Sequence, residues 1–220
     1  GTQVVTEVLI RRPQLRHAVL VSPVVNDQES SLPIVALRFA QSATRETFHL
    51  AMTALSAYVL CGFVYFVQVL PHMLRYRLVE RMPRVEASVL FIRGEYDATS
   101  PRRFHSRLVA AAQNARRWEI RGAAHSIINA HAVGAAELIV THANDTLPPK
   151  GRMPAEEAVV PPPPHAGIGV VWSAMRERAA EWWSAARRDE AGVERAKERH
   201  ARILWRAYSR ARQDPRREVR

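Results

Sequence analysis

Short apolar runs alternate with helix-like segments through the first two thirds of the chain, and this alternation constrains the fold most strongly. Short runs closed by residues that favour turns predict buried strands, whereas apolar residues at three- and four-residue spacing predict helices. The predicted strands are 18–21, 87–92 and 117–120, and the predicted helices are 2–12, 102–113 and 131–142. The alternation predicts an α/β fold, with helices covering both faces of a parallel sheet of about three strands.

A proline-rich stretch, 148–164, lacks a helix or strand pattern and is typical of a stiff linker. After it, apolar residues follow a heptad-like spacing with a polar break near Gly192, which allows one long amphipathic helix or two. The predicted seam consists of Ile168, Trp172, Met175, Ala179, Trp182 and Ala186, then Val193, Ala196, His200, Ile203 and Ala207. We therefore predict three parts, which are a domain over 1–146, a linker over 147–166 and a basic helical tail over 167–220.

The segment 30–82 interrupts the alternation with helices alone. Within it, 50–70 holds 21 residues without a charged side chain, a length that could span a bilayer. Three polar residues dilute this run, so we favour two buried helices joined at Cys61 and Gly62, with Pro71 ending the run. An arginine-rich flank after it would also suit a spanning helix, which keeps that alternative open.

Several classes of protein lack their sequence signatures here. The single cysteine excludes an internal disulfide and a cysteine-rich zinc site. The chain has no His-Glu-x-x-His motif, no glycine-rich dinucleotide fingerprint and no phosphate loop. We therefore expect no metal and no organic cofactor. We also expect a cytoplasmic location and no membrane partner.

Two loops that follow neighbouring predicted strands carry a possible catalytic pair. Asp97 ends the run Gly94-Glu95-Tyr96-Asp97, and His125 lies in the run Gly122-Ala123-Ala124-His125-Ser126. A strand–helix–strand crossover returns both strands in one direction, so both loops open at the same edge of the sheet. An aspartate bonded to one imidazole nitrogen fixes the tautomer and leaves the other nitrogen as a general base. We therefore predict that Asp97 and His125 are the catalytic residues.

These loops, in the order Asp then His, resemble the acid and histidine loops of the α/β-hydrolase superfamily. The resemblance covers roughly residues 1–143. In it, 1–13 resembles the helix after the nucleophile elbow, 16–23 the next strand and 30–82 the helical cap. It implies hydrolysis of a small apolar ester-like substrate by a serine, with His125 as general base and Asp97 orienting it. In that alignment Gly1 is the last glycine of Gly-x-Ser-x-Gly, so the serine and the first strands would precede this chain. We therefore expect a truncated or partial family member that is inactive alone, which leaves open whether the chain is an enzyme.

The alternative is a non-catalytic interaction protein that uses its arginine-rich tail. The whole chain has a net charge of +11, and the tail combines an excess of basic residues with four tryptophans. Such a tail could bind an acidic partner or nucleic acid. Its interleaved glutamates favour helix surfaces that pair with themselves, so we do not expect nucleic acid. The oligomeric state stays open.

Overall fold

The structure, a computed structural model, describes residues 1–46, 50, 63–154 and 168–212. These residues fall into two compact units, the first formed by 1–50 with 68–154 and the second by 63–67 with 168–212. The first unit contains the sheet and the second contains the helical tail.

A parallel sheet of four strands in the order β1-β2-β3-β4 forms the centre of the first unit. Its strands are β1 (His17–Val21), β2 (Ser88–Gly94), β3 (Ala115–Ile120) and β4 (Lys150–Met153). Every residue of β2 is buried, because the strand has a neighbour on each side and helices on both faces. The predicted α/β class is therefore confirmed, and the three predicted strands are present.

β4 is a strand that the sequence analysis missed, and it lies inside the segment that we assigned to the linker. Its residues, Lys-Gly-Arg-Met, form no apolar run, and none of them is β-branched. Pairing with β3 recruits them, since the N–H of Arg117 donates to the Pro149 carbonyl and that of Arg121 to the Met153 carbonyl, each at 2.9 Å. The expectation of about three strands and of linker at 150–153 was therefore wrong, while the rest of the domain division stays a prediction.

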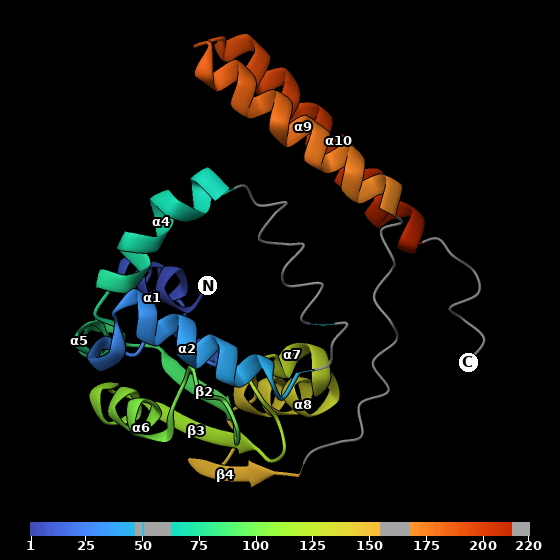
Figure 1. Ribbon diagram of the computed structural model, residues 1–220. Coiled ribbons are helices and arrows are strands. Elements are labelled where there is room, and N and C mark those ends of the chain that lie inside the picture. The colour runs from blue at the N-terminus through green and yellow to red at the C-terminus, as the bar shows by residue number, and fades with distance from the viewer. Residues whose placement is uncertain (47–49, 51–62, 155–167, 213–220) are drawn as a thin grey trace. The chain divides into compact units, whose positions relative to one another are not determined.

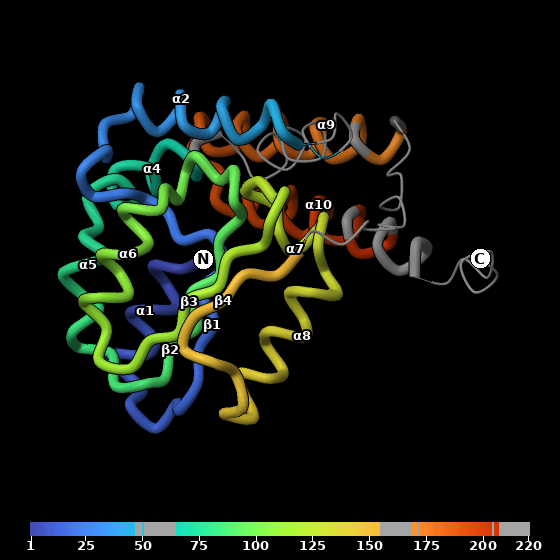
Figure 2. Tube along the Cα trace, turned by 90° about the horizontal axis from the view of Figure 1, so that it is seen from below, coloured from blue at the N-terminus to red at the C-terminus, as the bar shows by residue number. Residues whose placement is uncertain are grey.

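Helices cover both faces of the sheet, as Figure 2 shows. One face carries α1 (Thr2–Arg11), α5 (Leu78–Arg81) and α6 (Arg102–Ala111), and the other carries α8 (Ala132–Ala143). Alternate residues of β2 supply the two cores, because successive side chains of a strand point to opposite faces. Val89 and Phe91 pack with Phe104 and Leu108, whereas Leu90 and Ile92 pack with a cluster that includes Leu138.

The described part of the predicted cap is helical. It contains α2 (Leu32–Ala43), α4 (Phe63–Arg75) and α5. A short 3₁₀ turn at Asp27–Glu29 precedes it, and another at Met82–Arg84 begins at its last residue. Pro71 lies inside α4 and does not end it, so that expectation was wrong. The proposed junction at Cys61 and Gly62 lies outside the described residues. Among the helices that the structure describes, none is long and apolar enough to cross a membrane.

The tail folds as a helical hairpin of α9 (Ile168–Ala186) and α10 (Glu190–Arg212), which run side by side (Figure 1). The break falls at Arg188, whose φ of 58° is left-handed, and Asp189 Oδ1 caps α10 by accepting from the Gly192 N–H at 2.8 Å. The chain therefore takes the two-helix alternative.

The helix contact in the hairpin agrees with the predicted seam on α10 but not on α9. Ala196 and His200 are buried as predicted, whereas Trp172 of the predicted α9 seam is 70% exposed. The buried residues of α9 are instead Ala174 and Glu177. At this contact His200 Nδ1 donates to the Ala174 carbonyl at 3.2 Å, and Arg199 pairs with Glu177 at 2.7 Å. Bulky indole rings do not fit this close contact, so they lie outside it.

Leu108 of α6 is fully buried in the core, whereas Leu37 of α2 is 57% exposed. The two helical leucines therefore make a matched pair for comparing a core position with a surface position. We expect Leu108→Ala to lower the free energy of unfolding by about 3 kcal/mol, because it removes buried methyl groups and leaves a cavity. Leu37→Ala should change it by about 0.5 kcal/mol or less. Urea unfolding of both variants measures this, and equal losses would contradict the assigned core.

Candidate active site

The structure brings Asp97 and His125 together at the carboxyl edge of the sheet. His125 Nδ1 lies 3.2 Å from Asp97 Oδ2 and 3.3 Å from Oδ1. Asp97 follows β2 and His125 follows β3, and the crossover through α6 makes these neighbouring strands parallel. The geometry is the one that the crossover argument predicts, while the catalytic role of the two residues stays a prediction.

Close backbone contact holds the two loops against each other. The N–H of Tyr96 donates to the Ala123 carbonyl at 2.9 Å, and Glu95 Oε2 accepts from the Gly122 N–H at 3.0 Å. A Cβ atom at Gly94 would lie 2.1 Å from the Ala124 carbonyl oxygen, so only glycine allows this approach. Gly122 has a φ of 70°, a conformation that other residues rarely adopt.

The carboxylate of Asp97 is buried and held by several donors. Oδ1 accepts from the Thr99 N–H at 3.0 Å, from the Thr99 hydroxyl at 2.6 Å and from the Ser100 N–H at 3.1 Å. Burial alone would raise the pKa of Asp97. Hydrogen bonds and the charge of His125, with a further hydrogen bond from Thr99, outweigh burial and lower that pKa to about 2. Asp97 is therefore ionised throughout the physiological pH range.

Thr99 forms a third member of the group, which sequence reasoning missed. Its Oγ1 lies 2.7 Å from His125 Nδ1, closer than either oxygen of Asp97. Because the Thr99 hydroxyl proton goes to Asp97, its oxygen is left to accept from an N–H at Nδ1, which places the lone pair of the neutral ring on Nε2. Nε2 has no hydrogen-bond partner among the described residues. The Asp-Ala-Thr spacing is typical of a local turn in which an aspartate binds the N–H two residues on, and this was the available signal.

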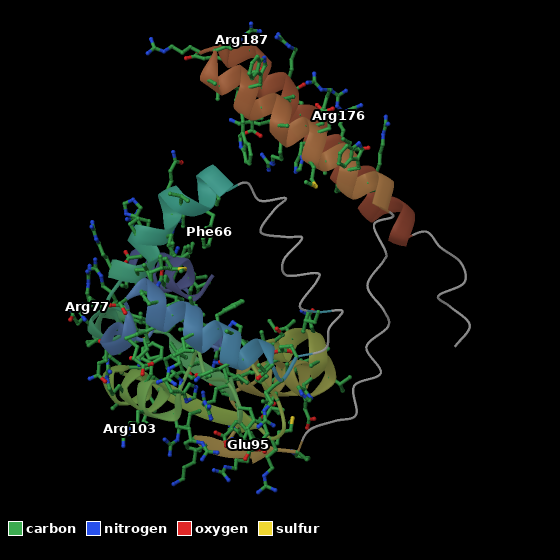
Figure 3. The ribbon with its side chains drawn as sticks, in the orientation of Figure 1. Phe66, Arg77, Glu95, Arg103, Arg176 and Arg187 are labelled. Carbon is green, nitrogen blue, oxygen red and sulfur yellow. The ribbon has the colours of Figure 1, made fainter. Side chains whose placement is uncertain are left out.

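Arg93 holds the Asp97 loop through hydrogen bonds to its backbone carbonyls. Its guanidinium is buried and donates to the carbonyls of Ser100 at 3.0 Å and of Asp97 at 3.3 Å, and it forms an ion pair with Glu119. Glu95, labelled in Figure 3, follows β2 and lies within 3.8 Å of Arg102. Glu95 also binds the His125 loop, through the Gly122 N–H.

Helix α2 lies across the same edge of the sheet (Figure 2) and contacts both loops. The ring of Phe39 packs edge-on against that of His125, with 6.0 Å between centroids. Ser42 Oγ accepts from the Ala98 N–H at 3.0 Å, and Glu46 Oε1 accepts from the Ser126 N–H at 2.8 Å. The sequence predicted a cap but not which of its residues reach the pair.

The amino end of α1 also lies near this edge. Ser22, directly after β1, donates its hydroxyl to the His125 carbonyl at 3.1 Å. Two residues further on, the Val24 carbonyl accepts from the side chains of Thr2 and Gln3, each at 3.4 Å. The first turn of α1 is thus tied to the loop that supports His125.

In the part of the chain that the structure describes, no group of three or more His, Cys, Asp or Glu side chains could hold a metal ion.

Comparisons with known proteins find little similarity. No protein-family model matches the chain. No curated protein matches it. Among solved structures, the chain is similar to MGS-M2, an alpha/beta hydrolase enzyme from a Medee basin deep-sea metagenome library, with 15% identity and a TM-score of 0.42. The match covers 67% of this chain and 63% of that one, so this chain spans less than two thirds of MGS-M2. The α/β class stated above rests on the strand order and parallel pairing themselves.

The lowered pKa of Asp97 makes stability depend on pH in the acid range. Because the pKa is about 2 in the folded protein against 3.8 for an ordinary aspartate, ionised Asp97 stabilises the fold above pH 3.8. That contribution, about 2 kcal/mol, is lost as the pH falls through 2. We expect Asp97→Asn to remove this acid-range loss from the pH profile of the unfolding free energy. A ¹³C NMR titration of Asp97 with a midpoint near 4 would contradict the assignment.

Proposed function

We propose that Asp97 and His125 are the acid–base pair of a serine hydrolase of the α/β-hydrolase type, which cleaves small apolar esters. The observation that supports this best is the orientation of His125. Its Nδ1 is engaged by Thr99 and Asp97, while Nε2 has no hydrogen-bond partner among the described residues. A neutral imidazole held in this way is the arrangement that nucleophilic acyl transfer requires.

In the proposed reaction, Nε2 removes the proton of a serine hydroxyl as its oxygen attacks the ester carbonyl. The imidazolium then gives this proton to the departing alcohol, which leaves an acyl-serine. Water hydrolyses the acyl-serine with His125 again as base. Asp97 stays ionised throughout and stabilises the imidazolium, and Thr99 holds the ring in register.

The nucleophile of this proposal stands on the chain before α1. In the family that the sequence resembles, the serine lies on a turn directly before the corresponding helix. The contacts from Thr2 and Gln3 to the Val24 carbonyl support this, because they tie the amino end of α1 to the loop beside His125. Ser22 is not a substitute, since its hydroxyl donates to the His125 carbonyl rather than to the free nitrogen.

A side chain of helix α2 supports the proposal that the substrate is apolar. Phe39 is 40% exposed and packs against the His125 ring, so it offers an apolar surface beside the imidazole.

For the 220-residue chain, we expect p-nitrophenyl butyrate to be hydrolysed no faster than by its His125→Ala variant, because the serine is not among these residues. Initial rates at neutral pH measure this. A rate that falls when His125 is replaced would show that the chain supplies its own nucleophile, and the placement of the serine before α1 would then fail.

A second expectation concerns the gene. We expect the codons directly upstream of Gly1 to encode Gly-x-Ser-x, and the protein that includes them to hydrolyse the ester. His125→Ala should then lower kcat/KM on the order of 10⁴-fold or more. Arg103→Ala is the control, because Arg103 lies exposed on α6, outside the cap and the two loops, and should leave the rate unchanged. Absence of the motif upstream, or equal rates in both variants, would overturn the hydrolase proposal.

A further inference from the structure

A second site lies on the face of the sheet rather than at its carboxyl edge. A cavity of about 420 Å³ opens there between α6 and the outer strands β3 and β4. We call it the basic cavity, after the charged and polar side chains that line it, among them Arg102, His105, Arg117, Glu119, Lys150 and Arg152. None of the reactions proposed above uses it.

Strand register explains why so many cations gather here. Arg117 is the β-partner of Lys150, and Glu119 is the partner of Arg152. Paired residues of parallel strands point to the same face, so both pairs point to the face that α6 covers. Figure 1 shows α6 beside β3 with β4 at the outer edge of the sheet. The helix supplies Arg102 and His105 as the facing wall.

The cations of the basic cavity are only partly neutralised. Glu119 pairs with Arg102 at 2.8 Å and with Arg152 at 3.3 Å, besides its ion pair with Arg93. Arg117 donates to Ser106 Oγ at 3.4 Å, and neither it nor Lys150 has an acidic partner among the described residues. These two adjacent cations, presented from neighbouring strands, form an electropositive surface inside a concave site.

An unsatisfied buried atom lies in the same wall. His105 is 4% exposed, and its Nε2 has no hydrogen-bond partner among the described residues. Burial, together with the nearby charges of Arg93 and Arg117, lowers the pKa of His105 to about 4, so its ring is neutral at pH 7. Its Nε2 is closed off from solvent, so the ring adds a neutral, buried wall to the cavity and leaves Arg117 and Lys150 as the groups that a ligand can reach.

We propose that the basic cavity binds a phosphate-bearing small molecule, with Arg117 and Lys150 pairing with its charge beside the ring of His105. Arginine forks and lysine ammonium groups are the usual partners of phosphate in proteins. The volume is that of a small-molecule site and exceeds what one inorganic ion needs. A concave site of this size therefore favours a small ligand over a nucleic-acid backbone.

Isothermal titration calorimetry of the 220-residue chain with pyrophosphate tests the proposal, at fixed ionic strength and pH 7.5. We expect saturable binding that weakens roughly tenfold in Arg117→Gln and again in Lys150→Gln. Arg103→Gln is the matched control, since Arg103, labelled in Figure 3, is an exposed residue of α6 that does not line the basic cavity. Its affinity should equal that of the unchanged chain. Both lining residues are exposed, so circular dichroism should show folded variants.

A second measurement reports on the buried nitrogen. In ¹⁵N NMR spectra, the His105 Nε2 resonance should shift on addition of pyrophosphate, while that of exposed His72 stays in place. Absence of saturable binding, an equal loss in Arg103→Gln, or an unmoved His105 resonance would overturn the proposal. Equally tight binding of citrate would overturn the assignment to phosphate. Binding of duplex DNA through the same two cations, without binding of pyrophosphate, would overturn the assignment to a small molecule.

Discussion

The contact between Gly94 and the carbonyl of Ala124 is the constraint on which the candidate active site depends. It lets the loops after β2 and β3 lie against each other, where backbone hydrogen bonds then hold them. A side chain at this position would push the loops apart. Asp97 and His125 would then lose the distance of 3.2 Å that joins a carboxylate to an imidazole. The distance between Asp97 and His125 therefore requires a residue without a Cβ atom at position 94.

The same β2–β3 pairing links the edge of the sheet to its face. Arg93 stands at the end of β2, supports the Asp97 loop through backbone carbonyls and pairs with Glu119 of β3. Glu119 in turn forms ion pairs with Arg102 and Arg152 at the basic cavity. One buried guanidinium therefore contributes to both sites, and one parallel register, extended to β4, determines which charges become neighbours.

Much of the fold could be predicted from local pattern, and the misses share a cause. Strands and helices with apolar periodicity were found nearly at their bounds, because periodicity reports burial of a segment against one surface. β4 was missed because its four residues owe their conformation to hydrogen bonds from β3 rather than to apolarity. The α9 seam was misplaced because large tryptophans dominate the pattern, whereas small Ala174 and the ion-paired Glu177 allow the close contact.

The sequence by itself determined the alternation of strands and helices, and through the single crossover between β2 and β3 it determined that Asp97 and His125 share an edge. Only the tertiary structure decided that Thr99 hydrogen-bonds both residues and that α2 brings Phe39 to the imidazole. It also decided that Arg117 and Lys150 are neighbours. The reason is physical. The direction of a strand follows from the connection before it, but the partner of a side chain depends on register and on close approach between segments far apart in the chain.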